Sequence, residues 1–288
     1  MILVVDALNK HKFKDILEEM FRLRARVFAD RLGWDVNVEN GMEVDQFDDL
    51  DPAYAIGLDD DGHVVSCARA LQTTGPHMLA DVFSDILDGE PPLRSPHVWE
   101  STRFCVDTKR LTTGTGRNSI AHATSELQIA CIESAIRAGV SDVVTVVDPV
   151  MNRVLKRSGN APYDYLGKTV PMGKVSAMAA LLDATPERVA SIRRTSGITH
   201  DVFATEVEAR ALFNKAHPAN TDQAPVEIEP ERTAAGMEAL VSYCRDQIQA
   251  AQSPAERKAA LELVDALAAT LPAKQRAEVH GAVRRAAA

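Results

Sequence analysis

The chain has 288 residues, 45% hydrophobic and 25% charged, which is ordinary for a soluble globular protein with one large domain or two modest ones. Its formal net charge of −9 argues against general nucleic-acid binding. No apolar run approaches the length of about 18 residues that indicates a membrane helix, and the N-terminus lacks the layout of a signal peptide. The four cysteines are widely spaced without a CxxC pair, so we expect reduced thiols and a cytoplasmic location.

The first two thirds of the chain alternate between strand and helix patterns. Residues 1–8 predict a strand, residues 12–34 an amphipathic helix and residues 35–53 an acidic loop. Residues 53–73 predict a β-hairpin that turns at Asp59–Gly62. The segments that follow are expected to be a short helix within 74–97, a strand at 98–107, a helix at 119–140, a strand at 141–149, a helix at 151–160 and one or two strands within 164–183. This order predicts an α/β fold, a mixed twisted sheet flanked by helices on both faces.

The last third carries helix signals without strand patterns. Thr185 and Pro186 have the N-cap and N1 arrangement of a helix start, and Thr205 and Glu208 have the spacing of a capping box. Residues 217–230 hold three prolines and few apolar residues, so they predict a linker. An alanine-rich helical hairpin or small bundle should follow.

We therefore expect a main domain over residues 1–198 and a helical C-terminal extension over 199–288. The extension contains thirteen acidic and ten basic residues. It therefore resembles neither a nucleic-acid-binding arm nor a membrane helix, and its role is open.

Acidic residues concentrate in one segment. Between Asp30 and Asp61 the chain has eleven aspartates or glutamates and a single base, Arg31. Such a run is either a solvated loop or a site for a cationic ligand.

The predicted strand "VWESTRFCVD" carries charges inside an apolar run. Glu100, Ser101 and Arg103 interrupt it, and burying an unpaired carboxylate or guanidinium is costly, so each should be paired or face a cavity. Strict alternation along a strand would place Glu100 and Arg103 on opposite faces. Either a bulge turns one of them around, or Arg103 braces a loop such as 45–48.

Further polar and aromatic residues form a spaced pattern with this strand. Arg24 and Phe28 share a helix face at i,i+4, and Trp34 follows the helix. Taken singly, each such residue is more often a surface charge, a core aromatic or a turn residue. The joint pattern R-x3-F-x5-W, D-x2-D, R and E-S-x-R resembles the signature of the acyl-homoserine lactone synthases, the autoinducer synthases of bacterial quorum sensing. Its eight positions are filled, in order, by Arg24, Phe28, Trp34, Asp45, Asp48, Arg69, Glu100 and Arg103, with Ser101 beside them.

The resemblance covers roughly residues 1–185 and implies an acetyltransferase-like, GNAT-type fold. It also implies a reaction between S-adenosylmethionine and an acyl thioester, most often carried by acyl carrier protein and in some members by coenzyme A. The amine of S-adenosylmethionine takes the acyl group, and its carboxylate then closes the lactone and releases methylthioadenosine. S-adenosylmethionine is a substrate, so no cofactor and no metal site are expected.

The resemblance also implies roles for the residues. Glu100 is the candidate general base, because burial would raise its pKa, and Ser101 and Arg103 are placed with it at the chemistry. The two loop aspartates, Asp45 and Asp48, would attract the cationic amine and sulfonium.

The arginines, the aromatic pair and one threonine complete the expected substrate site. Arg24, Arg69 and Arg103 would either fix the substrate carboxylate or clamp the acidic loop. The aromatic pair, Phe28 and Trp34, would cover the adenosine or the sulfonium. In this family a threonine near Thr145 is linked to acceptance of 3-oxo acyl chains, although a β-branched core residue would look the same.

Two features bear on the acyl donor. Arg110 precedes Gly114 and Gly116 in a glycine loop that is one residue too long for the coenzyme A motif of acetyltransferases, so a plain turn is an equal interpretation. A basic patch on the helix at 151–160 would suit an acidic carrier protein, or it is an ordinary solvated face. Its residues are Arg153, Lys156 and Arg157, with Lys168 and Lys174 after them.

Two other functions remain open. One is an acetyltransferase of the same fold that uses acyl-coenzyme A on another amine. The other is a non-catalytic binding protein in which the helical tail is the working part.

Overall fold

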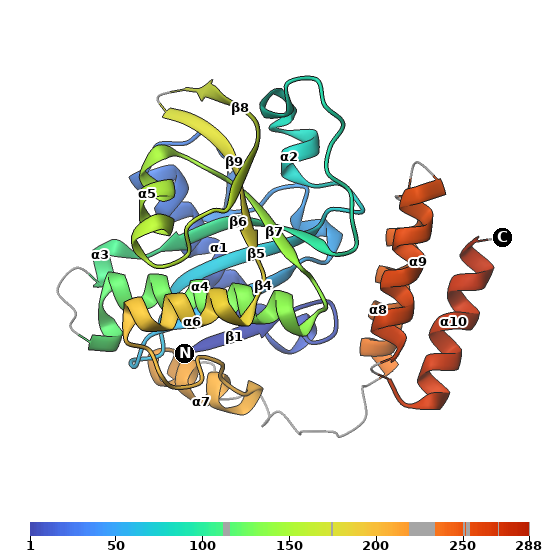
Figure 1. Ribbon diagram of the computed structural model, residues 1–288. Helices are drawn as coiled ribbons and strands as arrows, with labels where there is room; N and C mark the ends of the chain where they lie inside the picture. The colour runs from blue at the N-terminus through green and yellow to red at the C-terminus, as the bar shows by residue number, and fades with distance from the viewer. Residues whose placement is uncertain are drawn as a thin grey trace.

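Figure 1 shows a computed structural model of the chain, which describes residues 1–111, 116–173, 175–218, 234–249, 251, 254–269 and 271–287. At its centre lies a seven-stranded sheet in the order β1-β4-β5-β6-β7-β9-β8. The strands are β1 Ile2–Val5, β4 Ala53–Leu58, β5 Val64–Gln72, β6 Val98–Val106, β7 Asp142–Val147, β8 Asp164–Met172 and β9 Val175–Asp183. Only β6 and β7 pair in parallel among these strands, so the mixed sheet is confirmed.

Helices cover both faces of the sheet, as predicted (Figure 1). On one face lie α4 Ile120–Arg137, α5 Pro149–Arg157 and α6 Pro186–Ser196; on the other lie α1 Lys14–Arg24, its π-helical continuation η2 Ala25–Arg31, and the short helices α2 Met78–Asp81 and η4 Ser84–Leu87. Alternation along the strands divides the core accordingly. Ala68 of β5 packs in the α4 cluster, and the next-door Cys67 packs in the α1 cluster.

The expected acidic loop contains some regular structure. A short hairpin is formed by two strands of two residues each, β2 Val38–Glu39 and β3 Met42–Glu43. It precedes a single 3-10 turn, η3 Asp48–Leu50. This hairpin brings Glu43 over α1, where it is fully buried. The loop prediction was therefore wrong for residues 38–43, because a stretch this short has too little periodicity to reveal a strand pair.

The parallel strands β6 and β7 pair over only part of their length. Among their described residues, pairing begins at Val98 with Asp142 and ends at Glu100 with Val144. Beyond that point β6 continues beside β5 alone, and β7 continues beside β9. Glu100 therefore stands where the sheet opens.

The segment after the expected boundary at residue 198 packs on the main domain. Helix α7 Glu206–Ala216 begins with the predicted Thr205–Glu208 capping box, and its Ala209 and Phe213 belong to the α1 core. Phe203 makes a β-bridge with Ile2 of the first strand. We therefore propose that the main domain extends to about residue 218, beyond the expected boundary at 198.

The last three described helices form their own bundle (Figure 1). They are α8 Ala234–Gln249, α9 Pro254–Ala269 and α10 Ala273–Ala287, and they share one buried cluster. Leu8 packs against this cluster, and Thr74 Oγ1 donates a hydrogen bond to Gln247 Oε1 at 2.7 Å. None of the described helices is long and apolar enough to cross a lipid bilayer. The four cysteines are free thiols.

Candidate active site

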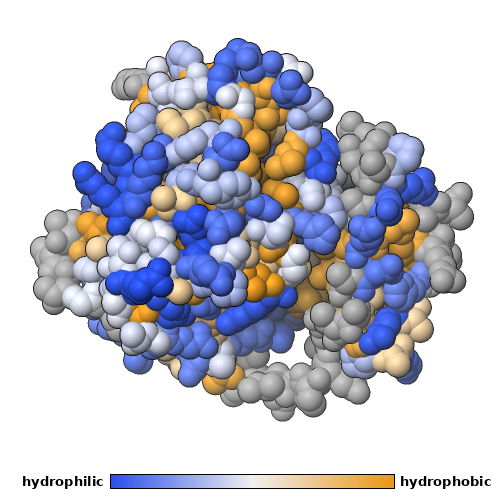
Figure 2. Space-filling view, viewed as in Figure 1, coloured by the Kyte–Doolittle hydropathy of each residue, from blue (hydrophilic) through white to orange (hydrophobic). Residues whose placement is uncertain are grey.

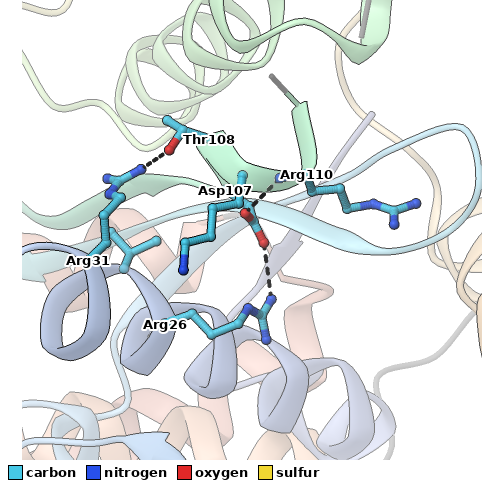
Figure 3. A pocket seen from close by; sticks show the side chains of 7 residues that line it. Arg26, Arg31, Asp107, Thr108 and Arg110 are labelled. Carbon is cyan, nitrogen blue, oxygen red and sulfur yellow. Dashed lines mark hydrogen bonds and ion pairs between the residues drawn. The ribbon is translucent and has the colours of Figure 1, made fainter. Parts of the chain in front are cut away.

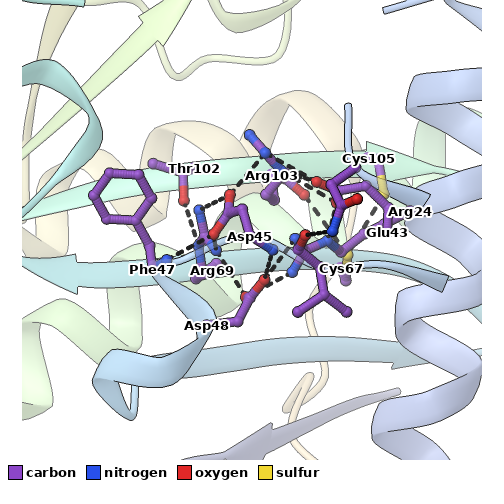
Figure 4. A network of polar contacts seen from close by, with 12 residues as sticks. Arg24, Glu43, Asp45, Phe47, Asp48, Cys67, Arg69, Thr102, Arg103 and Cys105 are labelled. Carbon is purple, nitrogen blue, oxygen red and sulfur yellow. Dashed lines mark hydrogen bonds and ion pairs between the residues drawn. The ribbon is translucent and has the colours of Figure 1, made fainter. Parts of the chain in front are cut away.

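A network of three arginines and three carboxylates lies between the α1 side of the sheet and the acidic segment (Figure 4). Its members are Arg24, Arg69 and Arg103 with Glu43, Asp45 and Asp48. Formal charges in this set cancel. The side chains of Arg24 and Arg69 have no exposed surface, and that of Asp48 is 3% exposed. Such groups are stable in the interior only because each has charged partners.

Asp48 is the centre of the network. It accepts two hydrogen bonds from Arg24, at 2.8 and 2.9 Å, and one from Arg69 at 2.7 Å. Tyr54 donates a further bond through its hydroxyl, at 2.7 Å. Burial alone would raise the pKa of Asp48, but the bonds and charge of Arg24, with the charge of Arg69, hold it well below its usual range. Asp48 is therefore an ionised structural anchor.

The other two carboxylates are paired as well. Arg69 donates to both oxygens of Asp45, at 2.6 and 2.9 Å. Glu43 accepts from Arg24 Nε at 2.5 Å and from Arg103 Nη2 at 2.9 Å. The arginines were expected either to fix a substrate carboxylate or to clamp the acidic segment. In the structure they make the contacts of the second role.

A β-bulge explains how Arg103 reaches this network. Between the pairs Cys67–Cys105 and Arg69–Thr102 the strand β6 has one extra residue. Arg103 occupies it with a φ of 51°, a left-handed conformation that is uncommon outside glycine. The extra residue turns Arg103 onto the α1 side, where it also contacts Asp45 at 2.7 Å. Both alternatives for this strand are thus realised together: a bulge turns Arg103, and the arginine braces the loop.

Glu100 lies on the same side of the sheet and is fully buried. Its two oxygens accept hydrogen bonds from the backbone N–H groups of Met78 and Leu79, at 2.6 and 2.8 Å, so it holds the start of α2. Burial raises its pKa to about 7, although the two backbone bonds and the charge of Arg69 oppose the rise. Each oxygen keeps a second lone pair, so the carboxylate can still accept a proton. The expected direction of the pKa shift is confirmed.

The aromatic pair is assembled where the π-helix ends. Gly33, at a φ of 64°, turns the chain, and Trp34 N donates to the Phe28 carbonyl at 2.9 Å. The two rings consequently stack with centroids 5.1 Å apart. The guanidinium of Arg103 lies over the Phe28 ring, 5.6 Å from its centroid. Phe28 is buried, whereas Trp34 is 45% exposed, so one face of the pair is open to a ligand.

Ser101 and Thr145 lie on the opposite, α4 side of the sheet. Ser101 lines a cavity of about 30 Å³ with Trp99, Val143 and Cys131. Thr145 follows Val144, the last residue of β7 that pairs with β6, and is buried. The structure therefore does not bring Ser101 to the carboxylate of Glu100, because adjacent strand residues point to opposite faces.

A larger, open cavity of about 420 Å³ lies between η2 and the end of β6 (Figure 3). Four basic side chains line it, those of Arg26, Arg31, Lys109 and Arg110, with Asp107 as the acid. Arg26 reaches Asp107 at 3.5 Å, and Arg31 donates to the Val106 carbonyl at 3.2 Å. Arg110 also pairs with Asp59 at 2.5 Å and with Asp61 at 3.3 Å, and the lining still carries more basic than acidic side chains.

The expected docking patch is on the surface. Arg153, Lys156 and Arg157 are all exposed on α5, and Lys156 lies 5.7 Å from the ring centroid of Tyr165 on the edge strand β8. Hydrophobic side chains also reach the surface in the upper part of Figure 2, over β8 and β9. Lys168 pairs with Asp88. Lys174 and the glycine-loop residues Gly114 and Thr115 lie outside the described residues.

Several site residues were missed from the sequence. Glu43 is one of many acids in its segment, and nothing in its spacing distinguishes it. Tyr54 and Met78 lie in unremarkable strand and helix patterns. Arg26 and Arg31 have the pattern of the polar face of a helix. Lys109 stands directly before Arg110, which the glycine-loop motif had already singled out, and could have been noticed.

Comparisons with known proteins agree on one family. The autoinducer synthase family model matches residues 8–192. A probable acyl-homoserine-lactone synthase of Sinorhizobium fredii is 39% identical over 178 residues, 62% of this chain and 85% of that protein. The acyl-homoserine-lactone synthase of Agrobacterium fabrum is 37% identical over 183 residues, 64% of this chain and 86% of that protein.

A solved structure has the same fold. It is the CoA-dependent acyl-homoserine lactone synthase BjaI with S-adenosylmethionine and isopentyl-CoA, which is 26% identical with a TM-score of 0.62. The match covers 74% of this chain and 98% of that one. The family match spans the network, Glu100 and the aromatic pair, and ends before α7 and the C-terminal bundle, so this chain belongs to the autoinducer synthase family.

Proposed function

We propose that the protein synthesises N-acyl-L-homoserine lactone, a quorum-sensing signal, from S-adenosylmethionine and an acyl thioester. The observation that carries the proposal is Glu100, a buried carboxylate with a pKa of about 7 where β6 and β7 separate. A general base works best when its pKa lies near the working pH. A carboxylate in this state is suited to take a proton from the ammonium group of S-adenosylmethionine.

The steps balance with this one base. Glu100 removes a proton from the ammonium, and the amine lone pair then attacks the thioester carbonyl. The amide bond forms as the carbon–sulfur bond breaks, and the second amine proton passes to the departing sulfur, which leaves as the thiol. In the second step the methionine carboxylate displaces the sulfonium, which closes the lactone and releases neutral methylthioadenosine.

S-adenosylmethionine is proposed to bind on the α1 side of the sheet. The open face of Trp34 can cover its adenine or its sulfonium, and neighbouring Leu32 and Val38 are also exposed apolar side chains. Because the carboxylates of the network are paired with arginines, their proposed part is to hold this platform in place.

The acyl chain is proposed to lie on the α4 side. A thioester carbonyl placed where β6 and β7 separate can reach Glu100 from one side and send its chain to the other. The cavity beside Ser101 is about the size of one water, so a chain must displace neighbouring side chains. Ser101 and Thr145 would then shape the chain pocket, and Ser101 would take no part in proton transfer.

The acyl donor is proposed to carry phosphopantetheine, either on acyl carrier protein or in coenzyme A. The cationic cavity at the end of β6 lies seven residues from Glu100, roughly 20 Å along a strand, and suits a phosphate group. The exposed arginines and lysine of α5 suit an acidic carrier protein, which remains our preferred donor. Synthesis from these metabolites would take place in the cytoplasm.

The test is to incubate the purified full chain with S-adenosylmethionine and matched acyl groups on carrier protein or on coenzyme A. We expect methylthioadenosine and an acyl-homoserine lactone to form in equal amounts. Chromatography and mass spectrometry measure both products. Absence of both products with every donor, and of lactone in expressing cells, would contradict the proposal. Faster turnover with one donor series identifies the donor.

A further inference from the structure

A second cluster of chemically active side chains lies away from Glu100, on the α4 side of the sheet. His122 and Glu126 are one turn apart on α4, and His200 comes from the segment between α6 and α7. Their ligand atoms lie within 4.8 Å of one another. The two Nε2 atoms are 4.0 and 3.8 Å from Glu126 Oε1, too far for hydrogen bonds.

The carboxylate between the two imidazoles is buried and half satisfied. Glu126 is 5% exposed, and its Oε2 lies 3.1 Å from the amino group of Met1. Among the residues that the structure describes, Oε1 has no hydrogen-bond partner, although it is buried. A buried carboxylate oxygen in this state is costly, and a cation between Oε1 and the two imidazoles would remove that cost.

The third ligand is held in place by its backbone. Arg193 of α6 donates from Nη1 to the His200 carbonyl at 2.8 Å and from Nη2 to Glu133 of α4 at 2.8 Å. Two residues later, the Val202 carbonyl accepts from Ile2 N at 2.8 Å. Arg193 Nη1 also donates to the Ile198 carbonyl at 3.3 Å, so the chain is anchored on both sides of His200. The His200 ring stacks on that of His122 with centroids 5.9 Å apart. Support of this kind orients metal ligands.

We propose that His122, Glu126 and His200 bind a divalent transition-metal ion, with zinc as the expected ion. Two imidazole nitrogens and one carboxylate oxygen are a known zinc ligand set, with water in the fourth position. Ligands about 2.0 Å from a tetrahedral zinc lie about 3.3 Å apart, so the observed atoms need to close by less than about 1.5 Å. His200 is exposed and can make this movement. The ion would join α4 to the segment that carries α7.

The test uses untagged full chain, dialysed against a chelator and then against buffer. Calorimetric titration with zinc should give about one ion per chain, and zinc should raise the melting temperature. The variants Glu126→Gln, His122→Ala and His200→Ala should each bind zinc at least tenfold more weakly and lose the thermal shift. The matched control is His11→Ala, which removes an exposed histidine elsewhere and should behave as wild type.

Two outcomes would overturn the proposal: no zinc binding by wild type, or binding that survives unchanged in all three variants. Because His200 is exposed, His200→Ala should keep the fold, which circular dichroism checks. Replacement of zinc by cobalt gives a second readout. A visible d–d absorption band should appear in wild type and be absent from His200→Ala.

Discussion

The two faces of strand β6 differ in their chemistry. Towards α1 and α2 it presents Glu100, Thr102 and, through its bulge, Arg103, all held by charged or backbone partners. Towards α4 it presents Trp99, Ser101 and Phe104, beside a small cavity and the apolar core. One strand can therefore separate a polar, preorganised side from an apolar side. A reaction that joins a charged nucleophile to an acyl chain needs both.

The largest effect is expected at Glu100. Glu100→Gln removes the base but keeps the size and one acceptor oxygen for the start of α2. We expect turnover to fall about 10²- to 10⁴-fold, the usual contribution of a general base. Activity assays measure this, and binding of S-adenosylmethionine and circular dichroism should change little. Turnover near that of wild type would show that the polar face does not supply the base.

The charged network should matter mainly for stability. Glu43→Gln leaves Arg24 and Arg103 without their shared carboxylate, and breaking a buried pair typically costs about 3–5 kcal/mol in the free energy of unfolding. Denaturant unfolding measures the loss. Glu39→Gln, an exposed acid of the same hairpin, is the control and should change stability by less than about 0.5 kcal/mol. Equal results for the two variants would mean that the network does not anchor the acidic segment.

The pH dependence tests the raised pKa of Glu100. Because the base must be ionised, turnover should fall about tenfold for each pH unit below about 7.

The stability effect has the opposite sign. The folded-state pKa lies above the ordinary value of 4.5, so the contribution of Glu100 to stability is complete below pH 4.5 and is lost as pH rises through 7. Unfolding measured across this range should show that decline in wild type and not in Glu100→Gln. If the difference in unfolding free energy between wild type and Glu100→Gln did not change with pH, the raised pKa would be contradicted.

The proposed substrate platform is tested at its exposed aromatic residue. Trp34→Ala should raise the KM for S-adenosylmethionine about tenfold, since stacking on an aromatic ring is worth about 1–3 kcal/mol per base. The acyl-chain preference should not change. Leu32→Ala, which removes a neighbouring exposed apolar side chain, should have a smaller effect. A KM unchanged by Trp34→Ala would place S-adenosylmethionine elsewhere.

A substitution on the apolar face of β6 should change the acyl-chain preference and leave the binding of S-adenosylmethionine unchanged. Ser101→Leu fills the cavity, and we expect the ratio of kcat/KM for long over short acyl donors to fall by about tenfold or less. The KM for S-adenosylmethionine and the rate with the shortest donor should remain near wild type. A large loss with every donor would instead return Ser101 to the chemical step.

Much of the fold could be predicted from the sequence because its signals are local. The caps at Thr185 and Thr205, the 3.6-residue period of the first helix and the turn at Asp59–Gly62 each depend on a few neighbouring residues. The hairpin at 38–43 and the position of α7 could not, because they depend on packing against distant elements.

For the candidate site, too, some features follow from the sequence and others only from the tertiary structure. By itself the sequence determined the α/β order, the family signature and the oddity of an acid and a base inside one core strand. Only the tertiary structure decided that Arg24 meets Glu43, that a bulge turns Arg103, and that the rings of His122 and His200 stack although the two residues are far apart in the sequence. The physical reason is that spacing along the chain reports which residues share a face. Pairing between distant segments depends on how the whole sheet and its helices close around them.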